Sequence, residues 1–210
     1  MNKNILCIGA HPDDIEIGMG GTVSKLTSLG YRVIMIVFAN SDMSNIEERC
    51  KEAKMSADFL NAEIEILDIT SEDLQKNRFL VGKLDEHIKR YSPESVYTHW
   101  IHDSHQDHQM IAQATISALR KNTCSLYMYE ETIPGGITSH SFRAQMYVDI
   151  GEHIDNKISA LKLHYSQIQS LNDENTWIYG IKGRAQYRGY QINSKFAEVF
   201  EIIKEIKNFD

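Results

Sequence analysis

Short apolar runs rich in β-branched residues alternate along this chain with longer stretches of helical periodicity. The runs predict strands at residues 5–9, 32–38, 63–67, 95–99 and 125–129. The stretches between them predict helices at residues 18–29, 45–60, 79–91 and 106–121. Strands that alternate with helices are typical of βαβ units, in which the strands run parallel. We therefore expect an α/β fold, a Rossmann-like three-layer sandwich with a largely parallel central sheet.

The regular alternation ends at a Pro-Gly-Gly turn, residues 134–136. Beyond it, residues 145–150 predict a strand and residues 152–169 a long amphipathic helix, whereas the Gly- and Tyr-rich segment 179–190 predicts no single element. Composition does not shift across the turn, as it would at a domain boundary. We expect residues 1–210 to form a single domain, because the chain lies within the usual size range of one.

The charge of the chain argues against nucleic acid as a partner. There are 22 Lys and Arg residues against 29 Asp and Glu, a formal net charge of -7 that is spread along the sequence. A surface that follows a phosphate backbone needs concentrated positive charge. We expect a small-molecule substrate and no nucleic acid.

The three cysteines, Cys7, Cys50 and Cys124, are scattered and form no C-x-x-C pair. This spacing indicates neither a disulfide framework nor a thiolate zinc cluster, and it favours a reducing cytoplasm. The N-terminal apolar run is too short for a signal peptide or a membrane span. We therefore expect a cytoplasmic protein that does not insert into a membrane.

A histidine and three carboxylates follow the first predicted strand, in the stretch His11-Pro12-Asp13-Asp14-Ile15-Glu16. Ligands of parallel sheets bind at the carboxyl ends of the strands. Carboxylates this close together raise one another's pKa unless a cation compensates them. The pattern favours a divalent metal; the alternative is a polar loop that caps the helix while His11 is merely exposed.

Three histidines and two aspartates follow the fourth predicted strand, in the stretch His102-Asp103-Ser104-His105-Gln106-Asp107-His108. The ends of the first and fourth strands of such a fold can face one crevice, where the two clusters would meet. His105 and His108 are three residues apart and share a face on the first turn of a helix. The alternative is a histidine-rich cap with incidental metal affinity.

Two histidines and one carboxylate favour a catalytic zinc site, because they leave the fourth position of the metal open for water. A structural zinc site is closed by four protein ligands, which usually include Cys. Zinc lowers the pKa of its bound water to about 7, and an adjacent carboxylate can take the proton. The same ligands suit ferrous iron, so both metals remain open.

Five ordered motifs run along the chain. The first two are A-H-P-D-D-I-E-I-G-M-G-G-T from Ala10 and H-Q-D-H from His105. The others are R-x-x-E-A from Arg49, K-x-x-A-L-x-x-H-x-S-Q from Lys157 and A-E-x-F from Ala197, so the set covers most of the chain. Together they resemble the LmbE/PIG-L family of metal-dependent N-deacetylases, which act on N-acetylglucosaminyl conjugates and related amino sugars. The resemblance implies an LmbE-like fold and the hydrolysis of an N-acyl amide.

The resemblance also implies roles for individual residues. Zinc would be held by three of them, His11, Asp14 and His108. Asp13 would be the general base that activates the metal-bound water. His105 would be the electrostatic partner or general acid, and Asp107 would be the carboxylate that orients it.

Two further residues are candidates for contact with the substrate. Arg49 would bind the sugar or an anionic substituent; alternatively, it forms a structural ion pair with Glu52 or Glu48. Asp103 stands where some relatives have a tyrosine that holds the tetrahedral oxyanion. A carboxylate would repel that oxyanion, so Asp103 either points away, accepting from a sugar hydroxyl, or the acyl group is held differently.

Glu16 and His164 are expected to have supporting roles. We expect Glu16 to stabilise the site or the start of the helix rather than to bind the metal. His164, a lone histidine on a predicted amphipathic helix, is expected to be a core residue.

The leading hypothesis is a zinc-dependent hydrolase that removes an N-acyl group, mainly N-acetyl, from an amino sugar or its conjugate, with Asp13 as base. A hydratase or lyase is the second hypothesis, because the same metal-bound water can add to an unsaturated carboxylic acid. The third is a non-catalytic metal- or sugar-binding protein. The sugar and the acyl group stay open, and the resemblance is compatible with a homo-oligomer.

Overall fold

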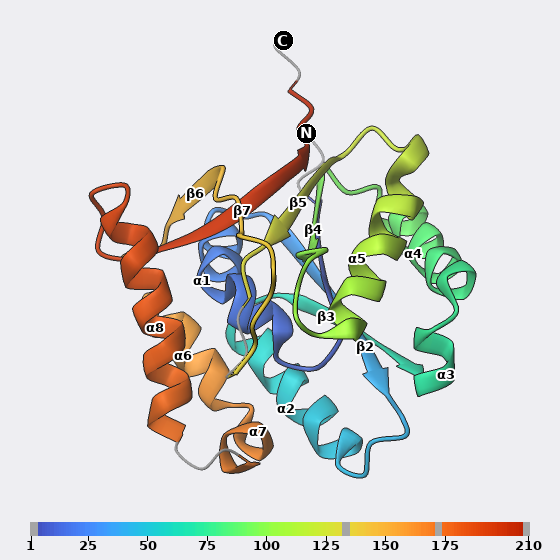
Figure 1. Cartoon of the computed structure of the whole chain (residues 1–210), viewed down its shortest axis with the longest axis horizontal. Coiled ribbons are helices and arrows are strands. Elements are labelled where there is room, and N and C mark those ends of the chain that lie inside the picture. Colours follow the sequence, from blue (N-terminus) through green and yellow to red (C-terminus); the bar gives the residue numbers. More distant parts are fainter. Residues whose placement is uncertain (1–3, 132–134, 171–173, 208–210) are drawn as a thin grey trace.

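A computed structural model of the chain describes residues 4–131, 135–170 and 174–207. Within these ranges a seven-stranded sheet runs through the molecule (Figure 1). Its strands are β1 (Asn4–Gly9), β2 (Arg32–Asn40), β3 (Glu63–Ile69), β4 (Ser95–His99), β5 (Ser125–Tyr129), β6 (Met146–Asp149) and β7 (Ala197–Lys204). Five strands run parallel in the order β3-β2-β1-β4-β5, and β7 and β6 extend the sheet by antiparallel pairing. The predicted α/β fold with a largely parallel sheet is confirmed.

Helices cover both faces of the sheet. They are α1 (Asp14–Ser28), α2 (Ile46–Phe59), α3 (Ser71–Leu74), α4 (Asn77–Tyr91), α5 (Gln106–Ala118), α6 (Ile154–Lys162), α7 (Tyr165–Ser170) and α8 (Glu174–Tyr190), with a 3-10 turn at Leu119–Lys121. Figure 1 shows α4 and α5 on one side of the sheet and α1, α2 and α6 on the other. Among the described residues, no helix is both long enough and apolar enough to span a membrane.

The strands are buried on both faces because their residues alternate between two hydrophobic clusters. Leu6 and Ile8 of β1 pack with α4 and α5, through residues such as Leu84 and Ile111. Cys7, between them, packs on the opposite face, in the cluster that contains residues of α1 and α2. This arrangement produces the near-continuous apolar runs of the strands, as expected for a covered parallel sheet.

The structure differs from the sequence-based expectation mainly in the last third. The helix expected at residues 152–169 is divided into α6 and α7, because the chain turns at His164, which is buried beside Glu16. The segment 179–190, for which no element was predicted, belongs to α8. β7 was not predicted either; its place depends on pairing with β5 and β6, which no local pattern reveals.

The order of the strands reverses between β1 and β4, which are neighbours in the sheet. Open parallel sheets bind ligands in the crevice at such a reversal, beyond the carboxyl ends of the strands. The first polar cluster follows β1 and the second follows β4, so the fold brings both to this crevice, as expected.

Helix α1 is interrupted at Met19, whose φ of -147° is not helical. The interruption leaves the backbone oxygen of Ile17 available to other donors. Lys157 Nζ on α6 donates to this oxygen at 2.8 Å, and Arg184 Nη2 on α8 donates to it at 3.0 Å. Two helices from the last third of the chain are thus attached to the break in α1.

The amides on the other side of the break are bound by Glu198 on β7. Its carboxylate accepts from Gly21 N at 3.0 Å and from Thr22 N at 2.6 Å. The same carboxylate forms a buried ion pair with Lys157. These contacts show what two motif residues do in the fold: Lys157 of K-x-x-A-L-x-x-H-x-S-Q and Glu198 of A-E-x-F hold the two sides of the break in α1.

We expect Glu198→Ala to destabilise the protein strongly. The change removes the acceptor of two amides and leaves the buried Lys157 ammonium without a carboxylate to balance its charge, which costs about 3–5 kcal/mol of unfolding free energy. Urea denaturation measures this loss. As a control, Glu63→Ala breaks an exposed ion pair with Arg32 and should cost less than about 1 kcal/mol. Equal losses of unfolding free energy in the two variants would contradict the stabilising role assigned to the Lys157–Glu198 pair.

Candidate active site at the carboxyl ends of β1 and β4

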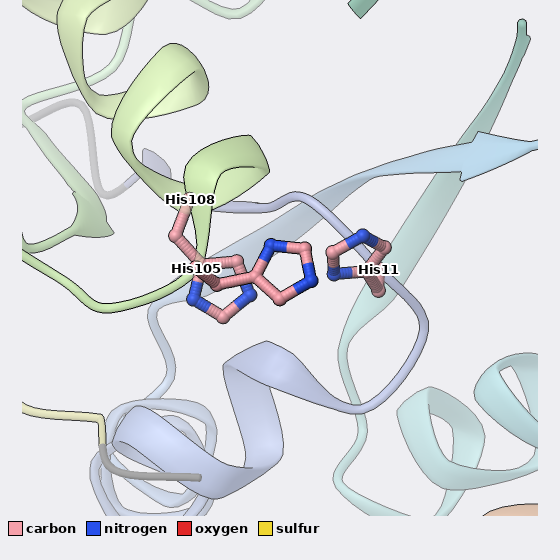
Figure 2. Close-up of side chains that lie close together, drawn as sticks. All are labelled: His11, His105 and His108. Carbon is pink, nitrogen blue, oxygen red and sulfur yellow. The ribbon is translucent and has the colours of Figure 1, made fainter. Parts of the chain in front are cut away.

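The two polar clusters meet in a cavity of about 330 Å³. Every predicted site residue except Asp103 lines it: His11, Asp13, Asp14, Arg49, His105, Asp107 and His108. Figure 2 shows His11, on the loop after β1, beside His105 and His108 at the start of α5. The His105 ring centre lies 4.8 Å from that of His11 and 4.7 Å from that of His108.

The loop between β1 and α1 turns sharply at Asp13, whose φ is 114°. Positive φ values are unusual for residues other than glycine, and such strain clusters at functional sites. Ile17 N donates to the Asp13 carbonyl at 3.0 Å, and His11 N donates to Asp14 Oδ2 at 2.7 Å. The turn therefore holds His11, Asp13 and Asp14 together at the end of β1.

Asp14 lies between the two histidines predicted to bind the metal. Its Oδ2 is 3.5 Å from His11 Nδ1, and its Oδ1 is 3.5 Å from His108 Nε2. Two ligands that bind a tetrahedral zinc at its usual distances lie roughly 3.4 Å apart. Each of these two spacings is close to that value, one at each carboxylate oxygen of Asp14.

Ligand atoms of the described residues form two sets in which all members lie within 4.8 Å of one another. One set is His11, His105 and His108; the other is Asp14, His99, His108 and Glu131. The predicted ligands His11, Asp14 and His108 do not form either set. His11 belongs to the first set, Asp14 to the second and His108 to both. One carboxylate oxygen of Asp14 lies near His11 and the other lies near His108. His108 is common to both sets and is 1% exposed.

The cavity attracts positive charge. Burial disfavours the charged form of His108, but the carboxylates of Asp14 and Glu131 outweigh it and raise the pKa of this imidazole to about 12. Burial is likewise outweighed at His11, whose pKa Asp14 and Asp107 raise to about 9. A site that holds protons this strongly also favours a divalent cation, provided that the histidines give up those protons.

Two buried residues, His99 and Glu131, complete the site although neither was predicted. His99 Nε2 accepts from Ala10 N at 2.9 Å and lies 3.1 Å from Asp14 Oδ2. His99 Nδ1 lies 3.0 Å from Glu131 Oε2, which is also 3.8 Å from His108 Nδ1. Both residues stand at the carboxyl ends of parallel strands, β4 and β5, so the rule that identified the two clusters would also have found them.

Arg49 extends from α2 to the base predicted for the reaction. Its Nη2 donates to Asp13 Oδ1 at 3.1 Å and to the Pro12 carbonyl at 2.8 Å. The alternative ion pair with Glu52 is not formed, because Glu52 accepts from the backbone and hydroxyl of Ser166. Burial raises the pKa of Asp13 to about 7, although the Arg49 charge opposes this shift.

Asp107 contacts a different histidine from the one expected. Its Oδ2 is 3.1 Å from His11 Nε2 but 4.0 Å from His105 Nδ1. His105 Nδ1 accepts instead from the backbone N–H of Asp107 at 3.2 Å, which caps α5. Burial lowers the pKa of His105, and the neighbouring His11 and His108 lower it further.

Asp103 is 5% exposed and does not line the cavity. Its Oδ1 accepts from His105 N at 2.8 Å, and its Oδ2 lies 3.4 Å from His108 Nδ1. Burial disfavours its charge, but the His108 imidazole outweighs burial and lowers the pKa of Asp103. The predicted contact of Asp103 with a sugar hydroxyl stays a prediction.

Glu16 and His164 form a pair beneath the loop, with 3.0 Å between Oε1 and Nε2. Glu16 is 1% exposed and His164 is fully buried. The pair joins the first turn of α1 to the corner between α6 and α7. His164 is therefore a core residue, as expected.

Comparison with known proteins agrees with these features. The family model described as GlcNAc-PI de-N-acetylase (PIG-L) matches residues 6–119. The uncharacterized deacetylase YaiS of Escherichia coli is 34% identical and aligns over 78% of this chain and 91% of its own. Diacetylchitobiose deacetylase of Thermococcus kodakarensis is 26% identical over 97% of this chain and 84% of its own.

A solved structure of a different enzyme shares the fold. GalB, a 4-carboxy-2-hydroxymuconate hydratase from Pseudomonas putida, superposes with a TM-score of 0.81 over 99% of this chain and 98% of its own, at 20% identity. That likeness concerns the fold alone. Because the family model spans more than half of the chain and YaiS matches most of it, this chain belongs to the GlcNAc-PI de-N-acetylase (PIG-L) family.

Proposed function

We propose that this protein is a metal-dependent hydrolase that removes the N-acetyl group from an amino sugar or an amino-sugar conjugate. The observation that carries the proposal is the convergence of His11, Asp14 and His108 in one cavity with a buried carboxylate, Asp13, beside them. The activities named for the two curated relatives support the deacetylase class, and diacetylchitobiose supports an acetylated amino sugar as the substrate.

Bound by His11, Asp14 and His108, a zinc or ferrous ion would supply a water of lowered pKa and polarise the amide carbonyl. Each histidine turns one nitrogen toward Asp14 and the other toward a second carboxylate. That carboxylate is Asp107 for His11 and Asp103 for His108. Carboxylates in this position orient metal-binding histidines and increase their basicity.

Asp13 takes the proton of the attacking water. Arg49 holds Asp13 Oδ1, so we assign the proton transfer to Oδ2. The backbone turn at Asp13 and the buried guanidinium keep this carboxylate in one position, which a general base requires. When the C–N bond breaks, the same proton passes to the leaving amine, and acetate and the free amino sugar are the products.

His105 stabilises the oxygen of the amide as it becomes negative. Because His105 Nδ1 accepts a hydrogen bond from Asp107 N, the proton of the neutral ring is on Nε2. A fixed N–H donor beside a developing oxyanion lowers the barrier without accepting a proton itself. We therefore assign the electrostatic role to His105, and Asp107 acts through His11.

His99 and Glu131 support the metal site through the loop that carries His11. His99 Nδ1 lies 3.0 Å from Glu131 Oε2, and His99 Nε2 accepts from the backbone N–H of Ala10, the residue before His11. Neither residue is exposed at its side chain, so the orientation of the ring does not depend on solvent. The pair therefore fixes the backbone at the end of β1 and acts on the metal through His11.

The base is tested by Asp13→Asn. Removing one general base typically lowers kcat by about 10²–10⁴-fold, so acetate release by the zinc-loaded variant should fall in that range. Zinc content measured by atomic absorption should be unchanged, because Asp13 is not assigned as a ligand. Glu47→Gln, an exposed change on α2, is the control and should release acetate at the normal rate. Normal release by the Asp13 variant would overturn its assignment as base.

The positioning pair is tested by Glu131→Gln. We expect zinc affinity, measured by competition with a chromophoric chelator, to fall by about 10–100-fold, as for other carboxylates that orient metal ligands. The matched control is Glu130→Gln, because Glu130 is the neighbouring residue but pairs with Arg188. If both variants bind zinc equally well, Glu131 has no role in the metal site.

A hydratase is the second candidate function, because the fold is similar to that of a known hydratase. The same coordinated water can add to a carbon-carbon double bond, and GalB shares the fold over nearly the whole of both chains. A panel of N-acetylated and N-formylated hexosamines, free and conjugated, assayed for released amine with and without a chelator, separates the two. Hydration of an unsaturated dicarboxylic acid without any release of amine would favour the hydratase, and tight zinc binding with neither activity would favour a binding protein.

A further inference from the structure

A second cavity, of about 660 Å³, lies beside the reaction cavity. One wall is α8, which contributes side chains at intervals of three or four residues, and the other is formed by residues 135–137 and Glu130. Trp177 of α8 lines both cavities. The ring is 6% exposed and packs with Ile17 and Ile181, so it occupies a fixed position where the cavities adjoin.

The charged groups of the second cavity are already paired with protein groups. Arg188 Nε donates to Glu130 Oε2 at 2.9 Å, and Arg184 donates to a backbone carbonyl of α1 at 3.0 Å. The remaining surface is mainly apolar and open to ligand: Ile137 is 88% exposed and Tyr187 is 58% exposed. These walls favour an uncharged group with a broad apolar face over a phosphate or a carboxylate.

Glycine keeps the α8 wall open. Gly180 lines the cavity, and a Cβ atom built at this position has no neighbouring atom within 4 Å. Gly183, one turn further along α8, is equally unobstructed but does not line the cavity. Glycine is unfavourable inside a helix, so Gly180 makes room at a cost in helix stability.

We propose that this second cavity binds the group attached to the amino sugar, and that this group is an uncharged ring such as an aryl aglycone or a second sugar. The inference rests on the proposed function, because it places the N-acetyl sugar in the reaction cavity. That cavity is at the lower end of the size range for ligand pockets and accommodates little beyond one sugar. The attached ring would extend past Trp177 and stack on the aromatic surface of α8.

The test measures kcat/KM of the zinc-loaded protein for four substrates. These are N-acetylglucosamine, the phenyl glycoside of N-acetylglucosamine, diacetylchitobiose and the uridine diphosphate conjugate of N-acetylglucosamine. We expect the phenyl glycoside, the disaccharide or both to exceed the free sugar by about tenfold, which corresponds to modest additional apolar burial. The larger of the two gains identifies the ring as aryl or sugar. A gain for the uridine diphosphate conjugate alone, or no gain for any conjugate, would overturn the proposal.

A pair of variants assigns the gain to this cavity. Gly180→Leu fills the cavity and should reduce the ratio of kcat/KM between the preferred conjugate and the free sugar to about one. Gly183→Leu introduces the same side chain on the same helix and should leave the ratio unchanged. Leucine favours a helix more than glycine does, so neither variant is expected to unfold α8. Equal ratios in the two variants would place the attached group elsewhere.

A binding measurement separates this inference from the proposed function. Titrations of the protein with the phenyl glycoside and with diacetylchitobiose, followed by tryptophan fluorescence, should show that at least one of the two binds more weakly to Gly180→Leu than to Gly183→Leu. Absence of acetate release from every substrate, together with this difference in binding, would refute the deacetylase and retain the cavity as a ring-binding site. Acetate release without the difference in binding would retain the deacetylase and refute the cavity.

Discussion

The buried ion pair between Lys157 and Glu198 is the interaction on which the arrangement of the site depends. An interrupted helix in a protein interior leaves backbone groups without partners, and these must be satisfied. At the break in α1, the pair satisfies the oxygen of Ile17 and two amides beyond Met19. The loop that carries the first polar cluster is continuous with the start of this helix. It is therefore held in place by elements from the opposite end of the chain.

At the site, the carboxylate of Asp14 lies within 3.5 Å of three imidazoles. Each ring has a second carboxylate at its other nitrogen: Asp107 for His11, Asp103 for His108 and Glu131 for His99. This pattern excludes free rotation of the rings and concentrates negative charge around one position. Such a set is costly in an apolar interior unless cations compensate it, and this is the physical reason that it suits a divalent metal.

The reaction site and the proposed substrate site lie in different parts of the chain. The family model ends at residue 119, after the proposed metal ligands, whereas Trp177 and the rest of α8 lie beyond it. Proteins of one fold can carry different functions, because function depends on the residues of particular sites and not on the fold itself. The proposed metal ligands thus lie within the segment that the family model matches, and the residues that line the proposed ring-binding cavity lie outside it.

The sequence by itself determined the α/β class, the order of the five parallel strands along the chain and the two polar clusters at strand ends, because these follow from local periodicity and residue type. It did not determine which imidazole each carboxylate meets. Asp107 is near His105 in sequence but holds His11, and Arg49 pairs with Asp13 rather than with a neighbour on its own helix. Only the tertiary structure decided these contacts, and the places of β7 and α8, because each depends on residues far apart in the chain.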